Sequence, residues 1–213
     1  MTKKTGSGSQ RLPEMTLEPG PWTLPQPVSS ELAYMVVTGM LLRRVKIEGG
    51  SSVELVGKGD LLLPWQGELA SFSQSEWEVV DRARLAVLDL RPGSPLSRTT
   101  DLAATIVARA IDRSRWLALQ SAIMSIVGIE ERLRSLLWAL AERWGERVPG
   151  GAEIEVNVPQ SVLAEMVGAR RPTVSLALGT LTEHGLLSSP EPGRWVLSGE
   201  PPEAVQEMAS KAS

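Results

Sequence analysis

The 213-residue sequence has no cysteine and only one histidine, and both shortages exclude kinds of chemistry. Without cysteine there is no thiolate zinc site and no iron–sulfur cluster. The single histidine, His184, argues against haem ligation and against histidine-based triads, because it stands just before Gly185 and reads as a residue at a helix C-terminus. We therefore expect no metal site and no cofactor.

The sequence also lacks a long apolar run and a strong excess of one charge. No stretch approaches the roughly 18 apolar residues of a membrane-spanning helix. The first residues, "MTKKTGSGSQR", are basic and polar without a following apolar stretch, so we interpret them as a flexible leader and not as a secretion signal. These features predict a soluble cytoplasmic protein with no membrane partner. The net charge of −3 provides no general attraction to nucleic acid, which would require locally placed cations.

Residues 31–97 have the pattern of a β domain, with short apolar runs separated by glycine-containing turns. The stretch "VKIEGGSSVELV" predicts a hairpin that turns at Gly49-Gly50, and "GKGD" predicts another tight turn before Leu61. Strands at this spacing indicate a small sandwich or roll. Residues 1–30 are rich in proline after position 18, and we expect them to be flexible or extended without regular structure.

A long helix is predicted after this domain, because residues 99–127 contain neither proline nor glycine and place apolar residues at helical intervals. Ala103, Ala110, Leu117 and Met124 recur every seven residues. The helix could lie on its own β domain, but a small roll cannot cover its whole length. We therefore assign residues 98–128 to dimerisation, with two copies of helix 99–127 pairing in a homodimer.

Residues 129–200 predict a third unit that ends in a winged helix-turn-helix. A second amphipathic helix stops at Gly145 and is followed by a loop, "RVPGGAE", and then by the order strand, helix, turn, helix, hairpin. Numbered from Gln160, the helix pair has a small residue, Ala164, at the fifth place and Gly168 at the ninth, where a left-handed turn is needed. Apolar residues occupy the places expected to be buried: Leu163, Val167, Val174, Ala177 and Leu178. Two helices that merely pack together would satisfy only part of this pattern. Residues 201–213 form a tail.

The second helix of this pair opens at "RRPTVS", with Pro172 near its first position. Its N-terminus therefore gathers two arginines and two hydroxyls where exposed N–H groups already favour a phosphate. Arg171 could instead read guanine, and solvated capping of the turn is the alternative for both arginines. The predicted contacts to double-stranded DNA are Gln160, Ser161, Arg170, Arg171, Thr173, Ser175 and, at the tip of the wing, Arg194.

Together these units resemble the Crp/Fnr family of bacterial transcription regulators over roughly residues 30–198. The resemblance is most specific in "VPQSVLAEMVGARRPTVSLALGTLTEHGLL" and weaker in "WQGELASF". It implies an α+β fold: an N-terminal jelly-roll-like β-roll, a long dimerisation helix and a C-terminal winged helix-turn-helix. It also implies a sequence-specific regulator that reads a roughly palindromic operator as a homodimer.

The resemblance implies a candidate effector pocket but argues against cyclic AMP. Gly67 and Glu68 match the segment that meets the ribose in ligand-binding relatives, and the remaining pocket candidates are Trp65, Trp77 and Arg82. Core packing is the alternative for the two tryptophans. The arginine followed by a hydroxyl residue that clamps the phosphate in those relatives is missing from "SQSEWEVVDR", because Arg82 has no small hydroxyl residue beside it. We expect either an unknown small-molecule effector or constitutive DNA binding.

Two other classes of function remain open. The protein could be an effector-sensing or scaffold protein whose winged helix contacts a protein instead of DNA. This is open because Arg170, Arg171 and Arg194 are offset in sequence by acidic residues, namely Glu165, Glu183 and Glu191. Catalysis is the least favoured class and we assign no catalytic residue, since Asp60, Glu68 and Asp81 are scattered acids of a kind that is usually solvated.

Overall fold

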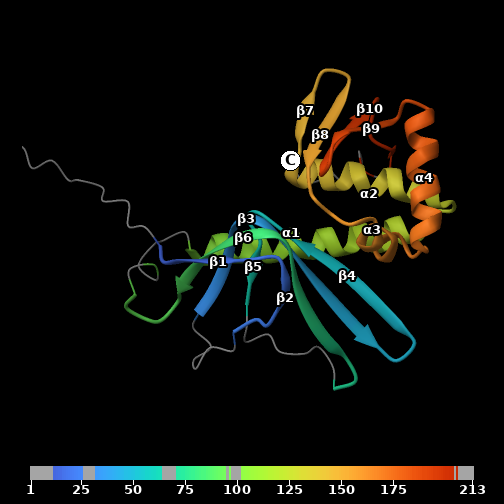
Figure 1. The fold of residues 1–213 in the computed structure, drawn as a ribbon. Coiled ribbons are helices and arrows are strands. Elements are labelled where there is room, and N and C mark those ends of the chain that lie inside the picture. Colours follow the sequence, from blue (N-terminus) through green and yellow to red (C-terminus); the bar gives the residue numbers. More distant parts are fainter. Residues whose placement is uncertain are drawn as a thin grey trace, which may run out of the picture.

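The structure is a computed structural model that describes residues 12–25, 32–63, 71–94, 96, 102–203 and 205. A β-sheet domain, one long helix and a C-terminal unit of helices and strands follow one another along the chain (Figure 1). Within the described residues, no helix is long and apolar enough to cross a membrane. The α+β class predicted from the sequence is confirmed.

The N-terminal sheet is antiparallel and has the strand order β1-β6-β3-β4, with β2 also on β6 and β5 also on β3. The predicted hairpin at Gly49-Gly50 is confirmed, because Ile47 pairs with Gly50 across the turn. The strands are β1 (Glu14–Leu17), β2 (Gly20–Trp22), β3 (Leu32–Ile47), β4 (Gly50–Val56), β5 (Leu61–Leu62) and β6 (Gln74–Asp89).

The N-terminal segment, predicted to be flexible or extended and poorly regular, contains two regular strands in its described residues 12–25. Within it, β1 and β2 both pair with β6, and Pro21 lies opposite Glu78. Proline removes one donor from a strand but is tolerated at the edge of a sheet, where no further strand needs that N–H group. The prolines therefore mark edge strands here.

Strands β3 and β6 are long, and their pairing is interrupted near Gly39. The register shifts three times between Val36 and Leu41. Gly39 has a φ of 85°, and a Cβ atom there would collide with the carbonyl oxygen of Arg82. Only glycine fits this close approach between β3 and β6. The approach accompanies the bulges in the pairing of the two strands.

Two helices connect the sheet to the C-terminal unit. Helix α1 (Leu102–Met124) falls inside the predicted helix 99–127, of which residues 99–101 lie outside the described part of the chain. Helix α2 (Ile129–Trp144) ends at Gly145 as predicted. The apolar face of α2 is buried, and it includes Leu133, Leu136, Leu137 and Leu140.

The C-terminal unit combines two short helices, α3 (Gln160–Val167) and α4 (Arg171–Glu183), with a sheet in the order β7-β8-β10-β9. The prediction that "RVPGGAE" is a loop was wrong. This stretch forms a hairpin whose strands meet at Val148 and Gly151, because Pro149-Gly150 supplies a tight turn. The wing is therefore part of a four-stranded sheet: β7 (Glu146–Val148), β8 (Gly151–Glu155), β9 (Leu187–Glu191) and β10 (Arg194–Ser198).

The hydrophobic core joins the sheet domain to the C-terminal unit. The larger cluster contains Leu42 and Leu55 of the sheet together with buried residues of α1, α2, α3 and α4. A smaller cluster lies on the other face of the sheet and contains Leu41 and Leu85. Neighbouring residues on a strand point to opposite faces, so Leu41 and Leu42 serve different cores. One face of the roll is thus used to hold the helix-turn-helix in place.

Candidate nucleic-acid interface

The turn between α3 and α4 has the geometry that the sequence predicted. Gly168 has φ 64° and ψ 40°, the left-handed conformation, and its N–H group and that of Ala169 bond back to carbonyls of α3. A Cβ atom at Gly168 would lie 2.6 Å from Cε of Met124, at the end of α1. The left-handed turn requires glycine here, whereas the contact with Met124 involves only the end of a flexible side chain.

The residues predicted to be buried between the two helices are buried. Leu163, Val167, Val174, Ala177 and Leu178 all belong to the larger core cluster, as does the small residue Ala164. Arg132 of α2 supports the turn, since its guanidinium donates to the carbonyl oxygens of Val167 and Ile126. The helix pair is therefore held rigidly on α2.

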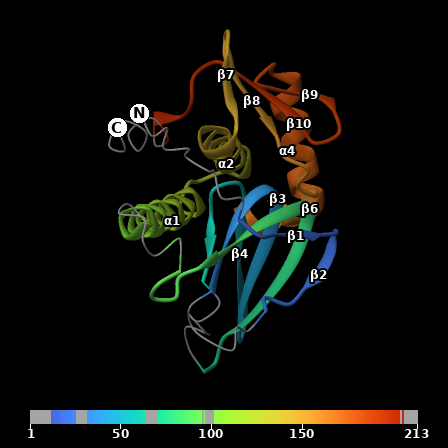
Figure 2. The same ribbon diagram turned by 90° about the vertical axis from the view of Figure 1, so that its left-hand side faces the viewer.

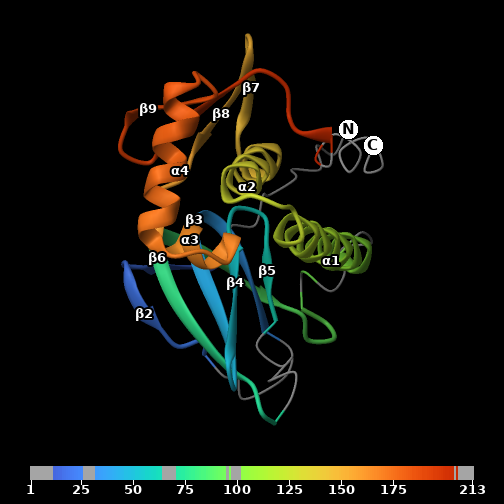
Figure 3. The same cartoon turned by 90° about the vertical axis from the view of Figure 1, so that its right-hand side faces the viewer.

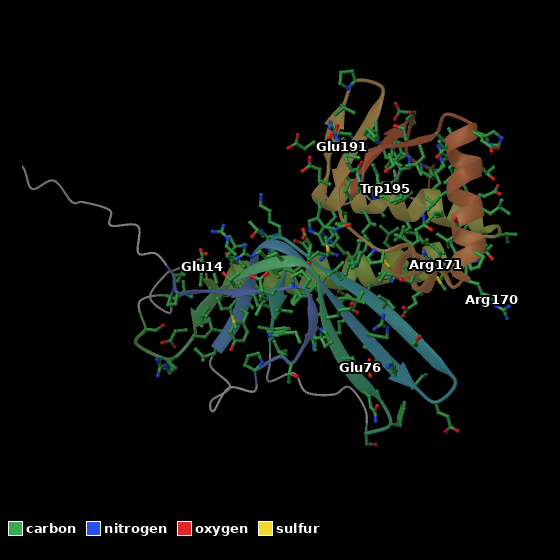
Figure 4. All side chains as sticks on the ribbon, viewed as in Figure 1. Glu14, Glu76, Arg170, Arg171, Glu191 and Trp195 are labelled. Atoms are coloured by element: carbon green, nitrogen blue, oxygen red, sulfur yellow. The ribbon has the colours of Figure 1, made fainter. Side chains whose placement is uncertain are left out.

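The N-terminus of α4 is exposed and has no side-chain cap. Arg170 is the residue before the helix, Arg171 begins it, and Pro172 is within its first turn as predicted. Arg170, Arg171, Thr173 and Ser175 are all exposed, and Figure 4 shows Arg170 at the outer edge of the molecule. Neither arginine has an ion-pair partner in the part of the chain that the structure describes. Two uncompensated cations thus flank unsatisfied helix N–H groups.

The start of α3 offers a second group of contacts. Gln160 is its first residue and is half-buried, whereas Ser161 is exposed. The helix is preceded by Pro159, which provides no side-chain cap. Ser161 is therefore available to solvent or to an anion, whereas the N–H groups of Val162 and Leu163 already donate to the carbonyl oxygen of Pro159.

Arg194 differs from the other predicted DNA contacts, because its charge is already compensated. Its Nε and Nη2 donate to the two carboxylate oxygens of Glu153, at 2.6 and 2.9 Å. The hydrogen bond from Arg194 lowers the pKa of Glu153, and the same bond raises the pKa of Arg194. From the sequence, Glu191 is the acid expected to offset the charge of Arg194. In the structure the acid that accepts both hydrogen bonds is Glu153 on β8.

Of the candidate effector pocket, only Trp77 and Arg82 lie in the described residues, since Trp65, Gly67 and Glu68 lie outside them. Trp77 packs edge-to-face against Trp22, with ring centroids 6.2 Å apart. Arg82 forms an exposed ion pair with Glu18 at 3.0 Å. These contacts favour packing as the role of Trp77 and a surface ion pair as the role of Arg82.

Sequence reasoning missed the ion pairs that fasten the sheet to the helical unit. Arg44 on β3 donates two hydrogen bonds to Glu165 on α3, at 2.8 and 2.9 Å, and these bonds raise the pKa of Arg44. Glu165 is thereby withdrawn from Arg170 and Arg171, which it was expected to offset. No signal in the sequence indicates this pair, because its partners are 121 positions apart.

A second missed contact surrounds Arg143 of α2. Its guanidinium lies 4.7 Å from the ring centres of both Trp116 and Trp144, and it donates to Asp60 at 2.5 Å. Burial raises the pKa of Asp60 despite this partner. Asp60, one of the scattered acids considered for catalysis, therefore joins the sheet to α1 and α2.

Comparison with known proteins shows which proteins this chain is similar to. Residues 131–198 match the family model of the Crp-like helix-turn-helix domain. A structure of a CooA mutant from Carboxydothermus hydrogenoformans is similar at a TM-score of 0.65 and 18% identity, covering 95% of this chain and 88% of that one. FixK2 from Bradyrhizobium japonicum is similar at 0.65 and 18%, covering 94% and 96%. A CRP/FNR-family transcriptional regulator from Thermus thermophilus is similar at 0.55 and 22%, covering 94% and 100%.

No curated protein matches the sequence significantly. The solved structures nevertheless each match almost the whole length of this chain, and the family model covers the helix-turn-helix and its wing. The chain therefore has the fold of the Crp/Fnr-type transcription regulators, and residues 131–198 are its Crp-like helix-turn-helix domain.

Proposed function

We propose that the protein is a homodimer that binds double-stranded DNA in a sequence-specific manner at an operator with two-fold related half-sites. The observation that carries the proposal is the free pair Arg170 and Arg171 at the uncapped, exposed start of α4. An α-helix with its side chains fits the major groove, which is about 12 Å wide. Entry of α4 by its N-terminal end would bring both guanidinium groups and its free N–H groups to the DNA.

The charges around α4 favour DNA over a protein partner. The protein-contact alternative depended on nearby acids that neutralise the arginines. Glu165 instead bonds to Arg44, and Arg194 is bonded to Glu153. The start of α4 therefore retains a local positive charge in a protein whose net charge is −3, as a phosphate-binding surface requires.

Dimerisation is assigned to the face of α1 that the described part of the chain leaves uncovered. Trp116 and Ile123 of α1 are buried, whereas Val107, Ile111 and Leu117 are 56%, 46% and 42% exposed. Figures 2 and 3 show α1 at the side of the molecule, with its outer face away from the other elements. A second copy of α1 would cover this apolar stripe. The two copies of α4 would then reach half-sites about one or more helical turns apart, each turn being about 34 Å.

The effector of the proposed regulator is not cyclic AMP. The strand that should carry a phosphate clamp has its charges paired: Glu76 is bonded to Lys46, Arg82 to Glu18, and Arg84 lies 3.5 Å from Glu14. A cyclic phosphate bound here would find no free guanidinium in the described part of β6, and its burial without a partner is unfavourable. The sensor domain is therefore assigned to a different small molecule or to no effector.

The proposal is tested by selecting bound sequences from random DNA with the purified protein and measuring the affinity for the selected operator at increasing salt. We expect a repeated, inverted half-site, and an affinity that falls steeply as salt rises, since phosphates are being neutralised. An affinity that does not depend on salt, or no selected sequence, would contradict DNA binding and favour the protein-contact alternative.

Dimerisation is tested separately by sedimentation. Val107→Lys is expected to shift the protein from dimer to monomer, because it places a charge in the apolar stripe. Ala108→Lys is the matched control, since Ala108 is exposed on the same helix but about 100° around it from Val107, on the side away from Leu117. A wild-type protein that sediments as a monomer at operator-binding concentrations would contradict the homodimer.

A further inference from the structure

The outward face of α4 has a centre that cannot form hydrogen bonds. Four buried residues, Val174, Ala177, Leu178 and Leu181, define the inward side of the helix. At 3.6 residues per turn, the positions directly opposite are 172, 176, 179 and 183. The first three are Pro172, Leu176 and Gly179, which have no polar side-chain atom, and the fourth is Glu183 at the C-terminal end of the helix.

Leu176 dominates this surface. Its exposed fraction is 73%, and within residues 129–198 it is the one large hydrophobic side chain that the structure leaves exposed. A single exposed leucine is common on protein surfaces, so its position carries the argument. It stands at the middle of the outward face, about one turn beyond the exposed residues Arg171 and Thr173.

The neighbouring residues on α4 do not cover the side chain of Leu176. A Cβ atom added at Gly179 would meet nothing within 4 Å, so the next turn of the outward face is open. The hydroxyl of Thr180 already donates its proton to the carbonyl oxygen of Leu176 within the helix, and Thr180 lies one turn farther along than Leu176. Beyond Ser175, the first exposed group that could approach a base edge is therefore apolar.

The chemistry of base edges then restricts what this group recognises. Among the four bases, only thymine presents an apolar substituent in the major groove, the C5-methyl group, whereas the other edges present hydrogen-bond donors and acceptors. We propose that Leu176 reads one thymine in each operator half-site by covering its C5-methyl group. This inference rests on the proposed function, and it names the base pair at the centre of the α4 footprint as T·A.

The test replaces each thymine of the selected operator half-site by deoxyuridine, which removes only the methyl group, and measures Kd by fluorescence anisotropy at fixed salt. At one position we expect wild-type affinity to fall about fourfold per half-site, the effect of uncovering one methyl group. The Leu176→Ala variant is expected to bind the operator with thymine at that position and the operator with deoxyuridine there with equal affinity. Phe72→Ala is the matched control, because Phe72 is another exposed hydrophobic residue, in the sheet domain, and should keep the methyl effect.

Two further measurements sharpen the assignment. Replacing the T·A pair by a C·G pair should weaken binding, and 5-methylcytosine should restore part of the loss, because it returns a methyl group to the same place. Leu176→Arg should shift the preference at this pair toward guanine, whose two acceptors match a guanidinium. Circular dichroism of the variants checks that α4 is intact, which is expected because alanine and arginine are both good helix formers.

The outcomes separate this inference from the function on which it rests. Wild-type binding that is salt-dependent but insensitive to every deoxyuridine overturns the role of Leu176 and leaves DNA binding intact. An equal loss in wild type and Leu176→Ala also overturns it, since another group must then contact the methyl. Absence of operator binding by the wild type overturns both proposals.

Discussion

The arginines of the N-terminal sheet and those at the start of α4 differ in one respect, which is whether their charge is compensated. On β3 and β6, Arg44, Arg82 and Arg84 each lie in an ion pair, and Arg43 donates to Ser75 and lies over Trp77. Arg170 and Arg171 have no such partner among the described residues. The first group stabilises the fold or its surface, and the second is left for a partner outside the chain.

The comparison shows that a cluster of basic residues is a poor guide to function until its partners are known. Burial lowers the pKa of Arg43, and the bonds to Glu165 raise that of Arg44, so both guanidinium groups respond to their own protein. Unpaired cations at a helix N-terminus can instead bind an anion from outside the protein. The predictions below test this division, beginning with the largest effect.

Removal of both free arginines should have the largest effect on DNA binding. Arg170→Ala combined with Arg171→Ala is expected to weaken operator binding about 100-fold or more and to reduce the salt slope by about two, since each contact contributes roughly 1–3 kcal/mol. The measurement is operator affinity at several salt concentrations. Arg82→Ala is the control, because Arg82 is paired with Glu18. An equal loss in that variant would erase the distinction between the two groups.

The next effect concerns the turn that aims α4. Gly168→Ala should destabilise the protein by roughly 1–2 kcal/mol, because alanine is strained in the left-handed region that this turn requires. Gly179→Ala offers a matched opposite: its Cβ meets nothing within 4 Å, and alanine in a helix is favoured over glycine by about 0.5–1 kcal/mol. Thermal unfolding compares the two variants. A stable Gly168→Ala would show that the turn is less constrained than its geometry indicates.

The ion pair that fastens the sheet to α3 should have a smaller effect. A double-mutant cycle with Arg44→Met and Glu165→Gln is expected to give a coupling of about 1 kcal/mol or less in the free energy of unfolding, because both groups are partly exposed. The pair Lys46 and Glu76 is more exposed and should give a coupling near zero. If the second pair couples as strongly as the first, the bidentate geometry of Arg44 has no special importance.

The smallest effect is expected at the wing. Glu153→Gln would release Arg194 from its carboxylate partner and leave it free to contact a flanking phosphate. The salt slope of operator binding should rise by about one, with a modest gain in affinity. An unchanged slope would mean that the wing does not approach the DNA. Arg194 would then have a structural role only, like the paired arginines of the sheet.

Much of this molecule can be predicted from local patterns. The helix-turn-helix depends on neighbouring residues: Gly168 for the left-handed turn, apolar residues at helical spacing, and Pro172 inside the first turn of α4. The hairpin at Gly49-Gly50 and the stop of α2 at Gly145 have the same origin. Each of these features is determined within a few residues by sterics and hydrogen bonding.

The errors and omissions involve residues that are far apart or strands that lack a local signal. The segment at residues 14–22 looks irregular in sequence because of its prolines, and only the edge of β6 makes it two strands. The hairpin of β7 and β8 becomes a stable element because β10 extends its sheet. The bidentate bond between Arg194 and Glu153 could not be predicted from the sequence, because the two residues come together only when β10 pairs with β8.

The sequence by itself determined that a glycine turn joins two short helices and that two arginines open the second, because turn and helix geometry are local. Only the tertiary structure decided which charges remain available, since Glu165 is drawn to Arg44 and Glu153 to Arg194 across large distances in the chain. Ion pairing falls off with distance in space and is indifferent to distance in sequence. The free charge of α4 is thus a property of the folded molecule.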